Sequence, residues 1–77
     1  MEKQDLYFVR QKITAPRRVP MMSGPGSDEF IKGLPSGVEV VVLEITLVRL
    51  TEWLKVKVTG LDGEDLGEGW INSIAVT

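Results

Sequence analysis

Trp53-Leu54-Lys55-Val56-Lys57-Val58 is the stretch that decides the fold, because its apolar and charged side chains alternate strictly. Successive side chains of a β-strand point to opposite faces, and strict alternation is typical of a strand with one face in the core and one in solvent. We therefore expect Leu54, Val56 and Val58 to be buried. Trp53 shares its face with two lysines, so its ring is expected at or near solvent.

The run Val38-Glu39-Val40-Val41-Val42-Leu43-Glu44-Ile45 predicts a second strand. Alternation divides its residues between two faces, and the face with fewer interruptions is expected to point inward. That face holds Val38, Val40, Val42 and Glu44. Ile45 then lies on the outward face. Residues 45–53 are few enough for a direct turn, so the two strands are expected to form an antiparallel meander.

Shorter apolar runs flank these two strands, and clusters of glycine and proline separate them. They cover residues 6–10 with an extension to 13, 19–22, 30–34, 69–71 and 74–76. Such spacing is typical of an all-β fold, and no stretch shows a convincing helical period. Five to six short antiparallel strands cannot form a large sandwich, so we expect a small half-open β-barrel. Frequent glycines over 60–69 predict a long flexible hairpin.

The composition limits the chemistry available to the chain. Its 77 residues suit a single domain over 1–77, and it contains no cysteine and no histidine. Disulfides, zinc, iron–sulfur and haem sites, and nucleophile–histidine catalysis all lose their usual side chains. A catalytic carboxylate pair would need a cleft, but many acidic residues cluster in the glycine-rich segment 60–69. We therefore expect no enzyme, no catalytic residue, no metal and no cofactor.

Charge and hydropathy restrict the partners. The net charge is −2, with a basic excess in residues 1–32 and an acidic excess in 33–77, which argues against nucleic acid. The longest apolar stretch, Val40–Leu43, is far shorter than the ~20 residues of a membrane helix, so no membrane insertion is expected. No signal peptide is recognisable. The location stays open: cytoplasmic if 1–77 is the whole protein, extracytoplasmic or in the cell envelope if it belongs to a secreted one.

Four short motifs give residues 19–77 a family resemblance. They are Ser23-Gly24-Pro25-Gly26-Ser27, the run from Phe30 to Leu43, Trp53-Leu54-Lys55-Val56 and Gly69-Trp70-Ile71-Asn72. In order and spacing they resemble the bacterial Src-homology-3-like domain. That family shows a Ser-Gly-Pro turn, a Gly- and Leu-containing strand entry, a strand opened by Trp and a final Gly-Trp element. The resemblance implies a small half-open β-barrel, and a non-catalytic module that contacts peptidoglycan or its peptides beside cell-wall hydrolases.

The chain departs from the family pattern in two places. Residues 19–22 read Val-Pro-Met-Met where members commonly have Leu-Asn-Val-Arg, so a ligand role of that Asn and Arg is not carried over. The segment 59–68 is longer than the usual Asp-Gly hairpin. The acidic loop and paired tryptophans of the eukaryotic relatives are also missing, and polyproline binding of their kind is not expected.

Three aromatic residues are the candidate ligand-binding positions. Trp53 and Trp70 offer large rigid apolar surfaces with one hydrogen-bond donor each, which favours interfaces. Tyr7 could line the same groove. Each also has a structural interpretation. Trp70 is expected to cover one end of the core, and a tyrosine at a strand edge is usually structural. For Trp53, the packing and the binding interpretations are equally favoured.

Other clusters are interpreted as ordinary surface or core. The acidic stretch 62–65 lacks the alternating ligands and closing glutamate of a calcium loop, so a solvated hairpin is favoured. A modest basic patch is formed by Arg10, Lys12, Arg17 and Arg18. At least one of Met21 and Met22 is expected in the core.

Two functional hypotheses follow. The first is a non-catalytic binding module for a cell-wall or peptide ligand, which uses the groove near Tyr7, Trp53 and Trp70. The second is a small docking or regulatory subunit of a larger protein assembly. The expected partners are thus a peptide, peptidoglycan or a protein, and the chain is expected to be a monomer in isolation.

Overall fold

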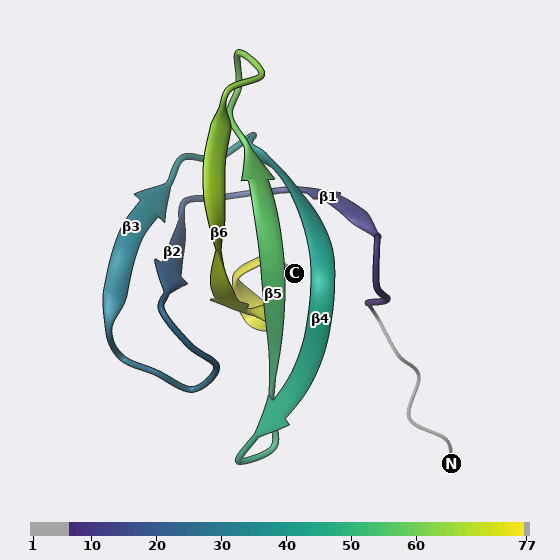
Figure 1. The fold of residues 1–77 in the computed structure, drawn as a ribbon, viewed down its shortest axis with the longest axis vertical. Helices are drawn as coiled ribbons and strands as arrows, with labels where there is room; N and C mark the ends of the chain where they lie inside the picture. The colour runs from purple at the N-terminus through teal and green to yellow at the C-terminus, as the bar shows by residue number, and fades with distance from the viewer. Residues whose placement is uncertain (1–6, 77) are drawn as a thin grey trace.

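The computed structural model describes residues 7–76 and contains six β-strands and one short 3₁₀ helix (Figure 1). The elements are β1 (Lys12–Thr14), β2 (Val19–Met22), β3 (Phe30–Leu34), β4 (Glu39–Val48), β5 (Thr51–Thr59), β6 (Asp65–Asn72) and η1 (Ser73–Val76).

All strands belong to one antiparallel sheet with the order β1-β4-β5-β6-β2-β3. The prediction of an all-β fold with five to six antiparallel strands is confirmed. The expected meander is present, since β4 pairs with β5 and β5 with β6. The sheet is not closed: within residues 7–76 no pairing joins its edge strands β1 and β3.

The core lies against one face of β4 and β5. Leu54, Val56 and Val58 are completely buried, as the alternation predicted. Direct cross-strand partners point to the same face of a sheet, and the pairs Val40–Val58 and Val42–Val56 place the valines of β4 inward as well. The other completely buried apolar residues are Val19, Leu34, Val38 and Ile71.

A β-bulge at Leu43 changes which residues of β4 point inward after Val42, compared with the predicted alternation. Val42 pairs with Val56 but Glu44 pairs with Lys55, so one extra residue stands between the two pairs. The extra residue reverses the alternation. Glu44, which strict alternation places on the same face as Val42, is therefore exposed on the outer face, while Ile45 packs against the core. The three valines predicted inward, Val38, Val40 and Val42, are buried.

The first predicted strand is wrong over residues 7–10. Tyr7 and Phe8 lie outside any strand, and Val9 and Arg10 form a turn with Arg10 at φ 75°. In this turn the Arg10 amide donates to the Val42 carbonyl at 2.6 Å, which brings β1 alongside β4. Leu6, the first residue of the predicted run, lies outside the described residues.

The C-terminal end also differs from the prediction. Residues 74–76 belong to the 3₁₀ helix η1 rather than to a strand. The hairpin before β6 is shorter than the expected flexible segment, because β6 already begins at Asp65. Its turn is closed by the Gly60 amide, which donates to the Glu64 carbonyl at 2.7 Å.

Ile71, not Trp70, provides the inward side chain near the end of β6. Trp70 pairs directly with Lys55, so it lies half-buried on the outer face, and the expectation that it covers the core is wrong. Gly69 points inward beside Met21, which is buried as expected for one of the two methionines. A Cβ on Gly69 would clash with Cγ of Met21, so this position has no room for a side chain beside the methionine.

Candidate functional site

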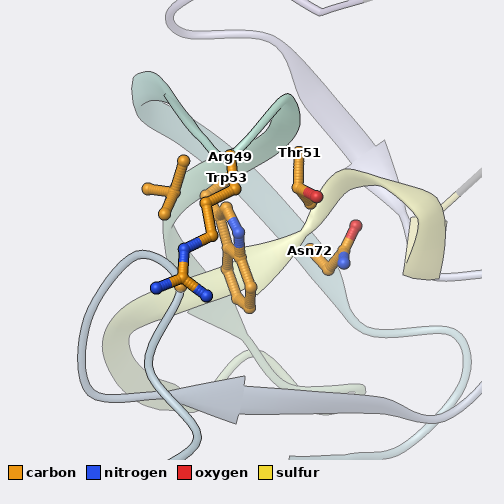
Figure 2. Close-up of a pocket in the computed structure, with 6 residues that line it drawn as sticks. Arg49, Thr51, Trp53 and Asn72 are labelled. Atoms are coloured by element: carbon orange, nitrogen blue, oxygen red, sulfur yellow. The ribbon is translucent and has the colours of Figure 1, made fainter.

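A pocket of about 350 Å³ lies where the β4–β5 hairpin approaches the loop between β2 and β3 (Figure 2). It is lined by Gly26, Val48, Arg49, Thr51, Trp53 and Asn72. Thr51 and Trp53 alternate to the outer face of β5, and Asn72 pairs with Trp53. The pocket therefore lies on the side of the sheet opposite the core, so a ligand there would not disturb core packing.

The β4–β5 hairpin turns through Arg49 and Leu50 alone, because Val48 and Thr51 are still paired. Both turn residues have positive φ, 52° and 68°, as a type I′ turn requires. Asn-Gly is the favoured sequence for this turn, since other residues are strained there. Leu50 is also 95% exposed, so no packing of its side chain offsets the strain.

The β2–β3 loop forms the opposite wall of the pocket. The predicted tight turn is present: the Ser27 amide donates to the Gly24 carbonyl at 3.2 Å, and Gly26 has φ +73°. A Cβ on Gly26 would lie 2.7 Å from Cγ1 of Val48. The loop thus contacts the hairpin closely, and glycine is required both by the backbone conformation and by the space.

Trp53 is half-buried between neighbours on both adjacent strands. It pairs with Thr46 of β4 and with Asn72 of β6. The side-chain oxygen of Asn72 accepts a hydrogen bond from the Ile74 amide at 3.0 Å, which holds the side chain at the start of η1. The NH₂ group of Asn72 is left as a donor for the pocket.

The other polar side chains of the pocket have no polar partner within the part of the chain that the structure describes. Among residues 7–76 the side chains of Arg49, Thr51 and Trp53 make no hydrogen bond and no ion pair. Figure 2 shows Arg49 and Asn72 on opposite sides of the Trp53 ring. The pocket thus combines a flat apolar surface with available donors, which is the usual composition of a small-ligand site.

The structure brings together only part of the predicted site. Trp53 lines the pocket. Trp70 is the diagonal neighbour of Trp53 on the outer face, because Trp53 pairs with Asn72 and Trp70 lies two residues before Asn72 on β6. Trp70 does not line the pocket. Tyr7 is buried, and its hydroxyl donates to the Ser73 carbonyl at 3.3 Å. Tyr7 therefore packs in the core and lies outside the pocket.

Sequence reasoning missed the three polar residues that accompany Trp53. Arg49 and Thr51 adjoin a turn whose sequence, Arg-Leu, carries none of the Gly or Asn signals of a type I′ hairpin. Asn72 was within a quoted motif, but no role was assigned to it. The usable signal was the Ser-Gly-Pro-Gly turn, because a loop this compact can approach the end of a neighbouring hairpin.

Residues 7–76 contain no group of three or more acidic side chains that could hold a metal ion. No helix in this part of the chain is long and apolar enough to cross a membrane.

Comparison of the chain with protein-family models, with curated proteins and with solved structures finds no match.

Proposed function

We propose that the chain is a non-catalytic binding module whose site is the pocket around Trp53. The observation that carries the proposal is the half-buried indole on the solvent side of the sheet, next to polar side chains with no partner among residues 7–76. Tryptophan is enriched at binding hot spots because a rigid ring buries a large area at low entropic cost.

A peptide is the ligand class that we propose. The sequence resemblance to bacterial Src-homology-3-like modules supports a cell-wall peptide as the first candidate and a half-open barrel as the type of fold. The observed fold is compatible with this resemblance only in being all-β and antiparallel. The Ser-Gly-Pro-Gly turn, one of the motifs behind the resemblance, contributes Gly26 to the pocket.

The test is a titration of the full chain with muropeptides, followed by tryptophan fluorescence and by the indole N–H signals of both tryptophans. We expect the Trp53 signal to shift at submillimolar ligand and the Trp70 signal to shift less. Trp53→Ala should reduce affinity by about tenfold or more, in the range of a hot-spot residue. Trp70→Ala is the matched control on the same face. No shift at either indole at millimolar muropeptide would reject the proposal.

Edge strand β3 favours a second candidate function, that of a protein-docking subunit. Phe30 and Ile31 are 58% and 45% exposed, and no strand pairs with the free side of β3 within residues 7–76. An exposed apolar edge strand is a template for pairing with another chain. Co-purification from native cells should then recover a partner that is lost with Ile31→Lys but kept with Trp53→Ala. A monomer with no partner at every salt concentration argues against this candidate.

A further inference from the structure

We propose that the pocket binds a carboxylate group of a peptide, with Arg49 as the anchoring residue. This inference rests on the proposed binding function, because it names the chemical group that the same site would take. It is carried by the hydrogen-bonding inventory of the pocket, by the charge at Arg49 and by the shape of the site.

The polar groups at the pocket are mostly donors. The guanidinium of Arg49 and the indole N–H of Trp53 can only donate hydrogen bonds. Asn72 contributes two further donors through its NH₂ group, and its oxygen already accepts one bond from the Ile74 amide. The acceptors still available are the Thr51 hydroxyl, which also donates, and the second lone pair of the Asn72 oxygen. A ligand that satisfies this set must present acceptor atoms.

The positive charge of Arg49 is not compensated within residues 7–76. The ion pair in this part of the chain joins Lys55 to Glu44 and does not involve Arg49. The β2–β3 loop carries Asp28 and Glu29, but neither lines the pocket, and the Glu29 carboxylate accepts a hydrogen bond from the Ser23 hydroxyl at 2.7 Å. The acceptor that suits the pocket is therefore an anion.

The shape of the site favours a ligand that carries a carboxylate next to an apolar group. A guanidinium binds a planar carboxylate through two parallel hydrogen bonds. Arg49 and Trp53 line the same pocket, so a ligand that binds the guanidinium there also meets the apolar indole surface. The volume of about 350 Å³ is at the small end for ligand sites and suits one or two peptide residues.

The experiment compares matched peptides on the isotope-labelled full chain. The probes are acetyl-Gly-Leu with a free C-terminal carboxylate, the same peptide as its C-terminal amide, acetyl-Gly-Glu-amide, and inorganic phosphate. We expect both carboxylate peptides to shift the Trp53 indole N–H and the Arg49 Nε–H. The amide of acetyl-Gly-Leu should bind about tenfold more weakly, as expected for loss of a charge-assisted pair. Whichever of the two carboxylate peptides binds with higher affinity shows whether the pocket prefers the carboxylate of a chain terminus or that of an acidic side chain.

Variants test the role of Arg49. Arg49→Gln should lower affinity for the free-carboxylate peptide by about tenfold, to the level of the amide. Arg49→Lys should restore part of the loss, because it keeps the charge but not the planar fork. Lys57→Gln is the matched control: it removes one positive charge from an exposed position on β5 outside the pocket, and it should leave affinity unchanged.

The outcomes separate this inference from the function on which it rests. If acid and amide peptides shift Trp53 equally, or if Arg49→Gln binds as the wild type does, the carboxylate site is rejected and a peptide-binding module remains. Tighter binding of phosphate than of either carboxylate peptide also rejects it. If neither these peptides nor muropeptides shift Trp53 at millimolar concentration, the proposed function fails together with the inference.

Discussion

The two faces of β5 differ in burial, in composition and in freedom to bind. On the inner face Leu54, Val56 and Val58 are 0% exposed. On the outer face Trp53 and Lys55 are half-buried and Lys57 is exposed. One strand thus supplies the centre of the core and the base of the candidate site. Because the faces alternate residue by residue, changes to stability and to binding should be separable with single substitutions.

The largest effect is expected from Val56→Ala on the inner face. Removing its two methyl groups leaves a cavity among completely buried neighbours, so we expect a loss of about 2 kcal/mol in the free energy of unfolding. A urea melt measures the loss, and peptide affinity of the folded variant should be unchanged. A loss below about 0.5 kcal/mol would show that the inner and outer faces have been exchanged.

Leu50→Gly tests the strained turn at the pocket end of the sheet. Glycine adopts positive φ without strain, and Leu50 loses little contact because it is 95% exposed, so we expect a gain of about 0.5–1 kcal/mol. Leu61→Gly is the control in the β5–β6 turn at the other end of the sheet (Figure 1), where Leu61 is exposed and its φ is not positive. It should be neutral or destabilising. Equal effects of the two substitutions in a urea melt would contradict strain at Leu50.

The alternation in β5 was sufficient to predict the core side of the sheet. Apolar residues alternate there with lysines, so only one assignment of residues to faces places the apolar side chains in the core and the lysines in solvent. In β4 the same logic held up to Val42 and failed at Leu43, because four apolar residues in succession do not reveal which one forms the bulge. The inversion of Glu44 and Ile45 follows from that single residue.

The candidate site was less predictable than the core. Trp53 was identified from its place among lysines, which is local information. Arg49 and Asn72 come together only through the pairing of β4, β5 and β6, and Gly26 only through a loop that follows β2. Tyr7 was misplaced because residues 7–10 read as a strand by composition, whereas they lie outside any strand and Tyr7 is the one residue among them that is buried.

The smallest effect is expected at the ion pair between Glu44 and Lys55 on the outer face. Its Nζ–O distance is 3.7 Å and the two side chains are 61% and 35% exposed, so solvent screens most of the attraction. We expect Glu44→Ala and Lys55→Ala each to change the unfolding free energy by under about 0.5 kcal/mol, with a coupling in the double mutant of about the same size. A coupling above about 1 kcal/mol at physiological salt would contradict the contrast between the faces, because the outer face would then contribute to stability as a buried network does. Repeating the melts at high salt provides the check, since a screened surface pair loses its coupling there while the effect of Val56→Ala persists.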